Sequence, residues 1–325
     1  MAVATRTRVL NDLLAHPNTW RSGDVLAQDL AVSRETIWKA INALRKSGHI
    51  ITARKSQGYQ YTGCTQLDQD AINFYSQRHP NFTVLATTDS TQLRAKELLN
   101  TGKITEPTAI IADQQTRGYG RRGRDFYSPQ ASGLYMSVIM PNPSGNLTNA
   151  GLLTTGVAAA AVQVLADFFP NKHFGLKWVN DILLNEHKVG GIITEAVMEM
   201  ESASSAAFIV GMGLNLTTAD FPAAISSKAG AIAAGADVDR NRLAAALLDR
   251  LTVDFSEFTS GSLLPVYRQY SLLIGRTVTL NLGQSTVTGR VQGIADDGSI
   301  ILAQADGSTQ NYSSGEVVRV MGWQH

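Results

Sequence analysis

Hydrophobic residues near the start of the chain recur at helical spacing. The pattern predicts helices over residues 5–15 and 23–30. A third helix begins after Ser33, a favourable N-cap residue, and ends before Gly48. The apolar stripe of this third helix consists of Ile37, Ala40, Ile41 and Leu44. Three short helices within 50 residues predict a small helical unit.

Two predicted strands, residues 51–54 and 59–62, follow the third helix, and Gly58 permits a tight turn between them. Helices followed by a hairpin indicate a winged helix-turn-helix. Its outer face carries donors suited to phosphates and purine edges in a DNA major groove. The candidate DNA-binding residues are Ser33, Arg34, Thr36, Asn42, Arg45, Lys46 and Lys55. Trp38 lies near this face and is expected to serve packing.

The distribution of charge favours DNA as the partner of this unit. Residues 1–64 hold nine Lys or Arg and four Asp or Glu, a net charge of +5, whereas the remaining residues have a net charge of −4. A basic unit of this kind binds polyanions. Two alternatives stay open, a small protein-binding domain used for dimerisation and a solvated basic face.

Length and composition limit the remaining possibilities. The 325 residues suggest two or three domains, and 44% hydrophobic with 17% charged residues is typical of a soluble globular protein rather than a disordered one. Cys64 is the single cysteine, which excludes an intramolecular disulfide and a multi-cysteine metal site, and fits a reducing cytoplasm. The first six residues lack the apolar run of a secretory signal. Residues 151–169 are apolar but contain Gln163 and Asp167, so we expect a buried helix rather than a membrane span.

Beyond residue 65 the basic bias ends, and helical and strand patterns alternate. Helices are predicted over residues 66–78 and 94–99, the second capped by the polar segment 87–92. This segment could also hold a small polar ligand. Strands are predicted over residues 82–86, 108–112, 134–140, 176–184, 189–195 and 208–216.

Residues 115–124 are rich in glycine and arginine. They contain G-x-G-x-x-G, but residues 125–129 cannot continue as a helix and no acidic residue follows at the required distance, which excludes a dinucleotide-binding motif. The chain also lacks the P-loop pattern. Four arginines beside only Asp113 and Asp125 favour phosphate binding. We expect this Gly/Arg segment to be mobile until an anion orders it; a solvated surface loop is the alternative.

Four motifs in order resemble the biotin protein ligases, specifically the bifunctional kind whose winged helix represses biotin genes. They are Gln115–Pro129, Lys177–Asp181, Lys188–Ile192 and Gly211–Asn215. The C-terminal region adds short predicted strands that resemble this family's SH3-like domain. These strands are residues 275–280, 287–294, 299–302, 308–312 and 317–320.

The resemblance implies a multidomain α+β fold. Residues 1–64 would be the winged helix-turn-helix, residues 65–270 a mixed α/β sheet domain like that of class II aminoacyl-tRNA synthetases, and residues 271–325 an SH3-like β-barrel. It also implies an activity. Biotin and MgATP would form biotinyl-5′-AMP, from which biotin passes to a lysine of a biotin carboxyl carrier protein. The adenylate would promote a homodimer that binds operator DNA.

By the same resemblance, Arg121 and Lys188 would join the biotin carboxylate to the α-phosphate. The biotin end would contain Ser90, Thr91, Gln92, Gln115, Gly118, Tyr119 and Gly120. The adenylate would face Arg122, Arg124, Asn180, Asp181, Asn215 and Phe221. The motifs themselves identify no Mg²⁺ ligand.

The chain departs from the family pattern at four positions. Tyr119 replaces a frequent arginine, Gln92 an asparagine, Val179 a proline and Phe126 a tryptophan. We expect ligand binding to survive at position 119, which the pattern uses through its backbone. Two rival functions remain. One is a lipoate ligase, whose function would not explain the winged helix and the SH3-like tail. The other is a DNA-binding biotin sensor without catalysis.

Overall fold

The computed structural model describes residues 3–102, 104–142, 150–198, 206–218, 220–235, 238–253 and 255–323. The chain forms two compact units. The first consists of Met1–His79 with Asp239–Ala246, and the second of Pro80–Val238 with Leu247–His325.

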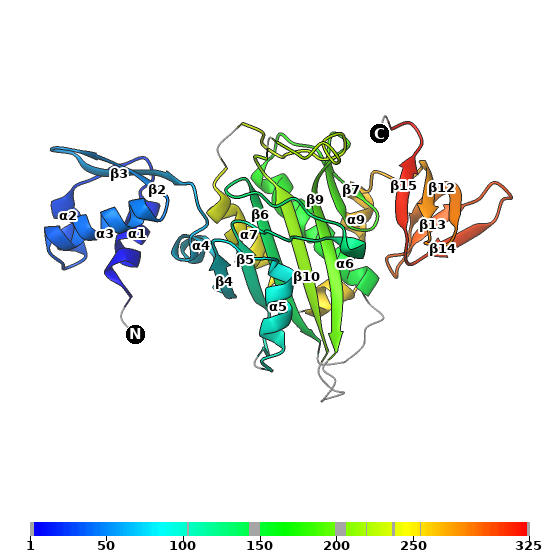
Figure 1. Ribbon diagram of the computed structural model, residues 1–325, viewed down its shortest axis with the longest axis horizontal. Coiled ribbons are helices and arrows are strands. Elements are labelled where there is room, and N and C mark those ends of the chain that lie inside the picture. Colours follow the sequence, from blue (N-terminus) through cyan, green and yellow to red (C-terminus); the bar gives the residue numbers. More distant parts are fainter. Residues whose placement is uncertain are drawn as a thin grey trace. The chain divides into compact units, whose positions relative to one another are not determined.

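The first unit contains the predicted three helices and hairpin (Figure 1). Its helices are α1 (Thr5–Ala15), α2 (Gly23–Asp29) and α3 (Arg34–Lys46). Its strands β1 (Trp20–Arg21), β2 (His49–Arg54) and β3 (Gly58–Cys64) form an antiparallel sheet in the order β1-β3-β2. The prediction of a winged helix-turn-helix is confirmed.

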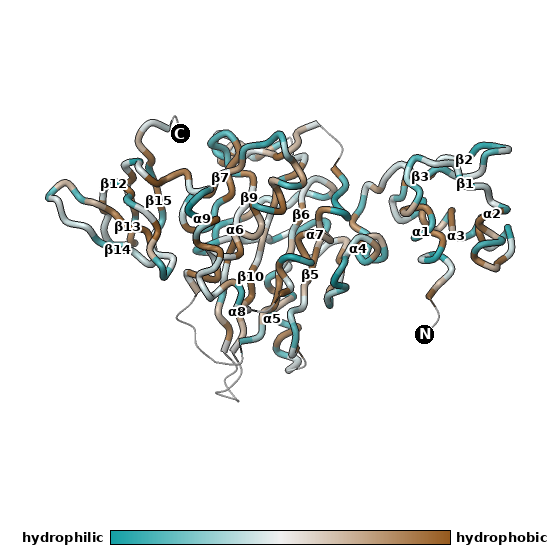
Figure 2. The backbone as a smooth tube through the Cα atoms, turned by 180° about the vertical axis from the view of Figure 1, so that it is seen from behind, coloured by the Kyte–Doolittle hydropathy of each residue, from teal (hydrophilic) through white to brown (hydrophobic). Residues whose placement is uncertain are grey.

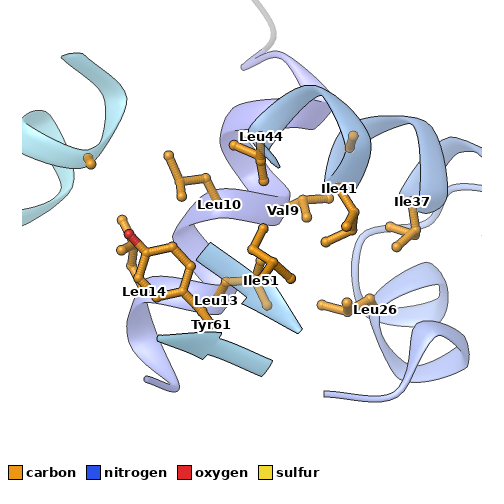
Figure 3. Packing of buried hydrophobic residues seen from close by; sticks show 12 residues of the cluster. Val9, Leu10, Leu13, Leu14, Leu26, Ile37, Ile41, Leu44, Ile51 and Tyr61 are labelled. Carbon is orange, nitrogen blue, oxygen red and sulfur yellow. The ribbon is translucent and has the colours of Figure 1, made fainter. Parts of the chain in front are cut away.

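The core of this unit forms where the apolar stripes of α1 and α3 meet (Figure 3). The hydroxyl of Ser33 accepts a hydrogen bond from the backbone N–H of Thr36 at 3.1 Å and so caps α3 as predicted. The predicted apolar stripe of α3 is buried. Trp38, in contrast, is 57% exposed, and its predicted packing role is wrong because its helical position points away from the core.

Helix α4 (Gln69–Tyr75) is shorter than the predicted helix over residues 66–78, because the Asp68 carboxylate caps it at its start. It belongs to the first unit, where Ala71 joins the core. The segment before α4 is fixed by the start of α7 (Arg240–Leu251), where Asn241 accepts a hydrogen bond from the Asp68 N–H at 2.8 Å. The first unit therefore extends past the link near residue 65.

The second unit is built on a seven-stranded mixed sheet. Its strands are β4 (Asn81–Leu85), β5 (Thr108–Ala112), β6 (Gly133–Asn142), β7 (Phe174–Lys177), β8 (Asp181–Leu184), β9 (His187–Met198) and β10 (Ala206–Asn215). The order is β4-β5-β6-β10-β9-β8-β7, with β4 and β5 parallel and the other pairs antiparallel. Helix α5 (Thr91–Leu99) packs against β5, β6 and β10 (Figure 1).

Helix α6 (Ala150–Phe168) is the predicted buried helix, and hydrophobic segments run along it and the central strands (Figure 2). Its length and composition would suffice to cross a membrane, but 61% of its apolar window is buried inside the protein. It packs against α8 (Phe255–Thr259), α9 (Leu264–Tyr270) and β9. Helices α7, α8 and α9 were not predicted from the sequence.

The C-terminal strands form a five-stranded antiparallel sheet in the order β14-β13-β12-β11-β15. They are β11 (Thr277–Asn281), β12 (Thr286–Ile294), β13 (Ile300–Ala303), β14 (Thr309–Tyr312) and β15 (Glu316–Val320). Two register shifts, one between Thr279 and Leu280 and one between Val291 and Gly293, are the bulges that bend such a sheet. The predicted short strands are therefore confirmed.

Candidate active site

A polar pocket of about 190 Å³ lies in the second unit, between the start of α5, the Gly/Arg segment and the strands β6, β9 and β10. We call it the first pocket. The predicted site residues that line it are Ser90, Thr91, Gln92, Gln115, Tyr119, Gly120, Arg121, Arg122, Arg124, Asn180, Asp181 and Lys188. These residues come from the polar segment 87–92 and three of the four motifs, and residues 211–213 of the fourth motif line the same cavity.

Gly118, which was predicted at the biotin end, is not among the residues that line the pocket. A Cβ at this position would lie 2.7 Å from both the Gln115 amide nitrogen and the Ser128 hydroxyl. The absence of a side chain lets Gln115 donate to Ser128 at 2.9 Å. Gly118 therefore supports the wall of the pocket from behind.

The start of α5 is tied to the Gly/Arg segment by hydrogen bonds. Gln115 Oε1 accepts from the Thr91 N–H at 2.8 Å and from its hydroxyl at 3.1 Å. Ser90 caps the helix by accepting from the Gln92 N–H at 3.2 Å. These contacts leave the short polar side chains fixed in the pocket wall.

Gln92 is 2% exposed and serves largely as a structural connector. Its Nε2 donates to the Ile209 carbonyl at 3.0 Å, and its Oε1 accepts from the Ser137 hydroxyl at 2.9 Å. Gly211 makes room for it, because a Cβ there would lie 2.6 Å from Gln92 Oε1. The Gln92 side chain is thus accommodated by β10.

The arginines of the Gly/Arg segment have carboxylate partners other than Asp113 and Asp125, which the sequence analysis did not identify. Arg122 and Arg124 pair with Glu316, the Arg124 Nη2 to Oε2 distance being 2.6 Å. Arg117 lies 3.7 Å from Asp89. The sequence showed too few nearby carboxylates because the main partner, Glu316, lies about 190 residues further along the chain.

Arg121 bridges two parts of the site. Its Nη1 donates to Asn180 Oδ1 and its Nη2 to the Gly315 carbonyl, both at 3.1 Å. Asn180 is itself anchored on β9, because its Nδ2 donates to the Ile192 carbonyl at 2.9 Å. Burial lowers the pKa of Arg121 below its ordinary value. A partly buried guanidinium with neutral partners retains unneutralised charge for an anionic ligand.

Two lysines add positive charge. Lys188 Nζ lies 2.7 Å from Asp181 Oδ1 on the neighbouring strand β8, and Gly191 leaves room for the Lys188 side chain, whose Cε would lie 3.0 Å from a Cβ at that position. Lys177, at the end of β7, also lines the pocket, and burial lowers its pKa. The resemblance assigned Lys177 no role, although the Lys177–Asp181 motif contains it.

A second pocket of about 510 Å³ shares Lys177, Asp181, Lys188 and Glu316 with the first. Asn215 and Phe221 line it as well, and Phe221 packs edge-on against Tyr127 with ring centroids 6.4 Å apart. The two pockets together resemble a site for an elongated ligand. All predicted site residues in this region except Gly118 therefore line one of the two cavities.

The C-terminal sheet contributes to both pockets, which the sequence did not indicate. Val317 lines both of them, and Val318 and Trp323 line the second. No local pattern marks these residues, since the contact depends on how distant segments pack. Phe126 and Ser137 also line the first pocket and were not predicted as site residues. Phe126 lies within the motif of residues 115–129, and Ser137 lies within the predicted strand of residues 134–140.

Among the described residues, no group of three or more His, Cys, Asp or Glu side chains is placed to hold a metal ion. Asp181 and Glu316 are carboxylates that line both pockets. Asp181 pairs with Lys188, and Glu316 pairs with Arg124. A divalent ion in this site would therefore depend on oxygen atoms of its ligand.

The predicted DNA-binding residues lie on α3 and the hairpin of the first unit. Arg34, Lys46 and Lys55 are exposed, while Thr36 and Asn42 are half-buried. Arg34 Nε lies 2.9 Å from Asp24, and Arg45 Nε donates to the Ile51 carbonyl at 2.9 Å. Arg45 thus also ties α3 to β2.

Comparison with known families identifies each region. Residues 5–60 match the HTH domain, residues 84–215 the biotin/lipoate A/B protein ligase family, and residues 273–320 the biotin protein ligase C-terminal domain. A solved structure, biotin protein ligase from Aquifex aeolicus in complex with biotin and ATP, is 29% identical, with a TM-score of 0.61, and covers 73% of this chain and 97% of that one.

Full-length relatives are also similar. The bifunctional ligase/repressor BirA of Bacillus subtilis is 30% identical over 306 residues, which are 91% of this chain and 93% of the relative. The protein of the same name from Escherichia coli is 29% identical over 304 residues. With this similarity along nearly its whole length, the chain belongs to the biotin protein ligase family of bifunctional ligase/repressors.

Proposed function

We propose that this protein is a biotin protein ligase that also acts as a biotin-responsive transcriptional repressor in the cytoplasm. The observation that carries the ligase activity is the convergence of Arg121, Lys188, Asn180 and Asp181 on one pocket beside the Gly/Arg segment. We assign DNA binding to residues 1–64, catalysis to residues 65–270 and a supporting role to residues 271–325.

In the first step, a carboxylate oxygen of biotin attacks the α-phosphorus of ATP and pyrophosphate leaves, which gives biotinyl-5′-AMP. The two reactants are anionic and repel each other, so cations must stand where they meet. Arg121 and Lys188 occupy this place, and Arg122 and Arg124 exchange Glu316 for the polyphosphate. The biotin end takes the first pocket, and the adenosine takes the second, near Asn215 and Phe221.

In the second step, a lysine amine of a biotin carboxyl carrier protein attacks the acyl carbon and AMP leaves. The mixed anhydride must be protected from water until that lysine arrives. The Gly/Arg segment is suited to this task, because Arg121 connects it to Asn180 on one side and Gly315 on the other.

ATP in this site would carry Mg²⁺, which would neutralise part of the polyphosphate charge. Asp181 and Glu316 line the second pocket and are the carboxylates that would hold such an ion.

The direct test is incubation with biotin, MgATP and an apo biotin carrier domain, followed by mass spectrometry. One carrier lysine should gain a biotinyl group, and lipoate should not compete. Biotin-dependent pyrophosphate exchange without transfer would indicate the wrong carrier. Absence of both would favour a DNA-binding sensor without catalysis.

The repressor activity is supported by the basic first unit and the exposed donors on α3. When no carrier is available, the retained adenylate promotes a homodimer, and two winged helices bind double-stranded operator DNA. This second activity uses the same ligand as the first, so the supply of biotin controls both.

A further inference from the structure

Tyr119, within the Gly/Arg segment, is bound by two charged side chains. Its hydroxyl donates to Glu195 Oε2 at 2.9 Å and accepts from Lys96 Nζ at 3.1 Å. Lys96 and Glu195 are paired directly at 2.8 Å. The three residues come from the last turn of α5, the Gly/Arg segment and β9, so the triad joins three separate elements.

The pKa shifts of the three side chains favour the protonation states that their hydrogen bonds require. Burial lowers the pKa of Lys96, but its hydrogen bonds to Glu195 and Tyr119 and the charge of Glu195 together outweigh this effect and leave it raised. Burial raises the pKa of Glu195, but hydrogen bonds from Lys96, Gln92 and Tyr119 leave it lowered. Burial raises the pKa of Tyr119, so its hydroxyl keeps the proton that it donates. At neutral pH Lys96 is therefore protonated, Glu195 is ionised and Tyr119 keeps its hydroxyl proton.

An arginine at position 119 could not make the same contacts. It has no acceptor for Lys96 and would place a second cation beside it. Tyrosine provides both a donor and an acceptor, and Lys96 Nζ also lies 5.7 Å from the centre of its ring. Lys96 and Tyr119 are thus matched to each other.

Inside the segment, backbone bonds connect Tyr119 to its neighbours. The Gly120 N–H donates to the Arg124 carbonyl and the Phe126 N–H to the Gly118 carbonyl, both at 2.8 Å. These bonds make a short closed loop whose far end carries Arg121 over the pocket. An anchor at position 119 therefore restrains the whole segment.

We propose that Lys96, Tyr119 and Glu195 hold the Gly/Arg segment closed over the first pocket before any ligand binds, and that Tyr119 is a positioning residue. The inference rests on the proposed function. A segment that is already ordered loses less conformational entropy when biotin binds. The anchor should then lower the KM for biotin and leave the chemical step unchanged.

Trypsin tests this directly, because the segment contains its own cleavage sites at Arg121, Arg122 and Arg124. In the ligand-free full-length protein, Tyr119→Phe and Lys96→Met should each raise cleavage at these sites at least about fivefold, equivalent to about 1 kcal/mol. Biotin with MgATP should make all proteins equally resistant. Mass spectrometry identifies the cut positions.

Two controls separate the anchor from general stability. Tyr312→Phe removes a tyrosine hydroxyl in the C-terminal sheet, where it donates to Gln310 at 2.9 Å, and should leave cleavage unchanged. Lys96→Arg keeps the donor and the charge and should preserve resistance. Equal cleavage of wild type and Tyr119→Phe, or faster cleavage of Tyr119→Phe at sites throughout the chain, would overturn the proposal.

Biotin-dependent pyrophosphate exchange provides the second readout. Tyr119→Phe should raise the KM for biotin about fivefold and change kcat less than twofold, the pattern expected when only ground-state binding is weakened. A loss confined to kcat would count against an anchor. If the wild type showed no exchange, the proposed function would fail, whereas the cleavage of the ligand-free protein would still decide whether the anchor exists.

Discussion

At the scale of single residues, a side chain of the site can both bind the ligand and hold the surrounding structure in place. Arg121 is assigned to the reacting phosphate, yet its two terminal nitrogens already bond to Asn180 and Gly315. The same contacts that place the cation also fasten the segment. Substitution of Arg121 should therefore affect both catalysis and retention of the intermediate.

We expect Arg121→Gly to release biotinyl-5′-AMP and label lysines of bystander proteins. Loss of a charged hydrogen-bond donor costs about 1.5–3 kcal/mol, so adenylate dissociation should accelerate at least tenfold. Labelling of serum albumin added to the reaction, followed by streptavidin blotting, measures the release. Arg117→Gly is the matched control, because Arg117 contributes only a distant, exposed pair with Asp89. Bystander labelling no higher than that of wild type would refute this role of Arg121.

A buried ion cluster in the first unit should make its stability depend on pH. His49 is 3% exposed, with Nε2 3.4 Å from Asp68, which also pairs with Arg6 at 2.6 Å. Burial lowers the pKa of His49, but the contacts and charges of Asp68 and Cys64 together outweigh this effect and raise it to about 9. The raised pKa means that protonated His49 stabilises the fold fully below about pH 6.5, and that this contribution disappears as pH rises through 9.

The loss should amount to at most about 3 kcal/mol. Hydrogen exchange of peptides covering α1 and β2, corrected for the intrinsic effect of pH, would measure it between pH 6 and pH 9.5. His49→Gln should remove most of the pH dependence, whereas His173→Gln, at an exposed position outside the first unit, should not. An unchanged pH profile in His49→Gln would show that other groups control stability in this range.

At the scale of elements, local patterns predicted α3 and the buried helix α6 but missed α7, α8 and α9. The Ser33 cap and the repeat of apolar residues fixed α3, and the four motifs located the residues of the pocket. Helix α8 has only five residues, too few for a repeat to appear, and was missed. Helix α4 was predicted too long because Asp68 was not recognised as its cap.

The recognition helix α3 supports a prediction about salt. Lys46 is exposed at its end and should contact a phosphate, whereas Arg45 is partly committed to the Ile51 carbonyl. Lys46→Ala should weaken binding to operator and to unrelated DNA by similar factors and reduce the slope of log K against log salt by about 1. Fluorescence anisotropy at several salt concentrations measures the slope. Lys172→Ala removes an exposed lysine outside the first unit and should leave it unchanged; an unaltered slope in Lys46→Ala would exclude this phosphate contact.

At the scale of the whole molecule, contacts between distant segments were the features that the sequence could not predict. Glu316 reaches Arg124 across 192 residues and Glu195 reaches Lys96 across 99. No periodicity or motif spacing contains this information, because it depends on how complete elements pack. The predicted strands of the C-terminal region were correct, but their participation in the pockets became evident only in three dimensions.

The last prediction concerns the coupling of ligand and DNA binding. If the adenylate favours the homodimer, then by linkage the dimer must bind the adenylate more tightly by the same factor. Sedimentation velocity should show the adenylate-bound protein dimerising at about tenfold lower concentration than the ligand-free protein, with a parallel gain in operator affinity. Lys46→Ala should weaken DNA binding and keep the dimerisation, since its side chain is assigned to phosphate. Equal sedimentation of both forms, together with equal affinity for DNA, would leave the ligase without a biotin-responsive repressor activity.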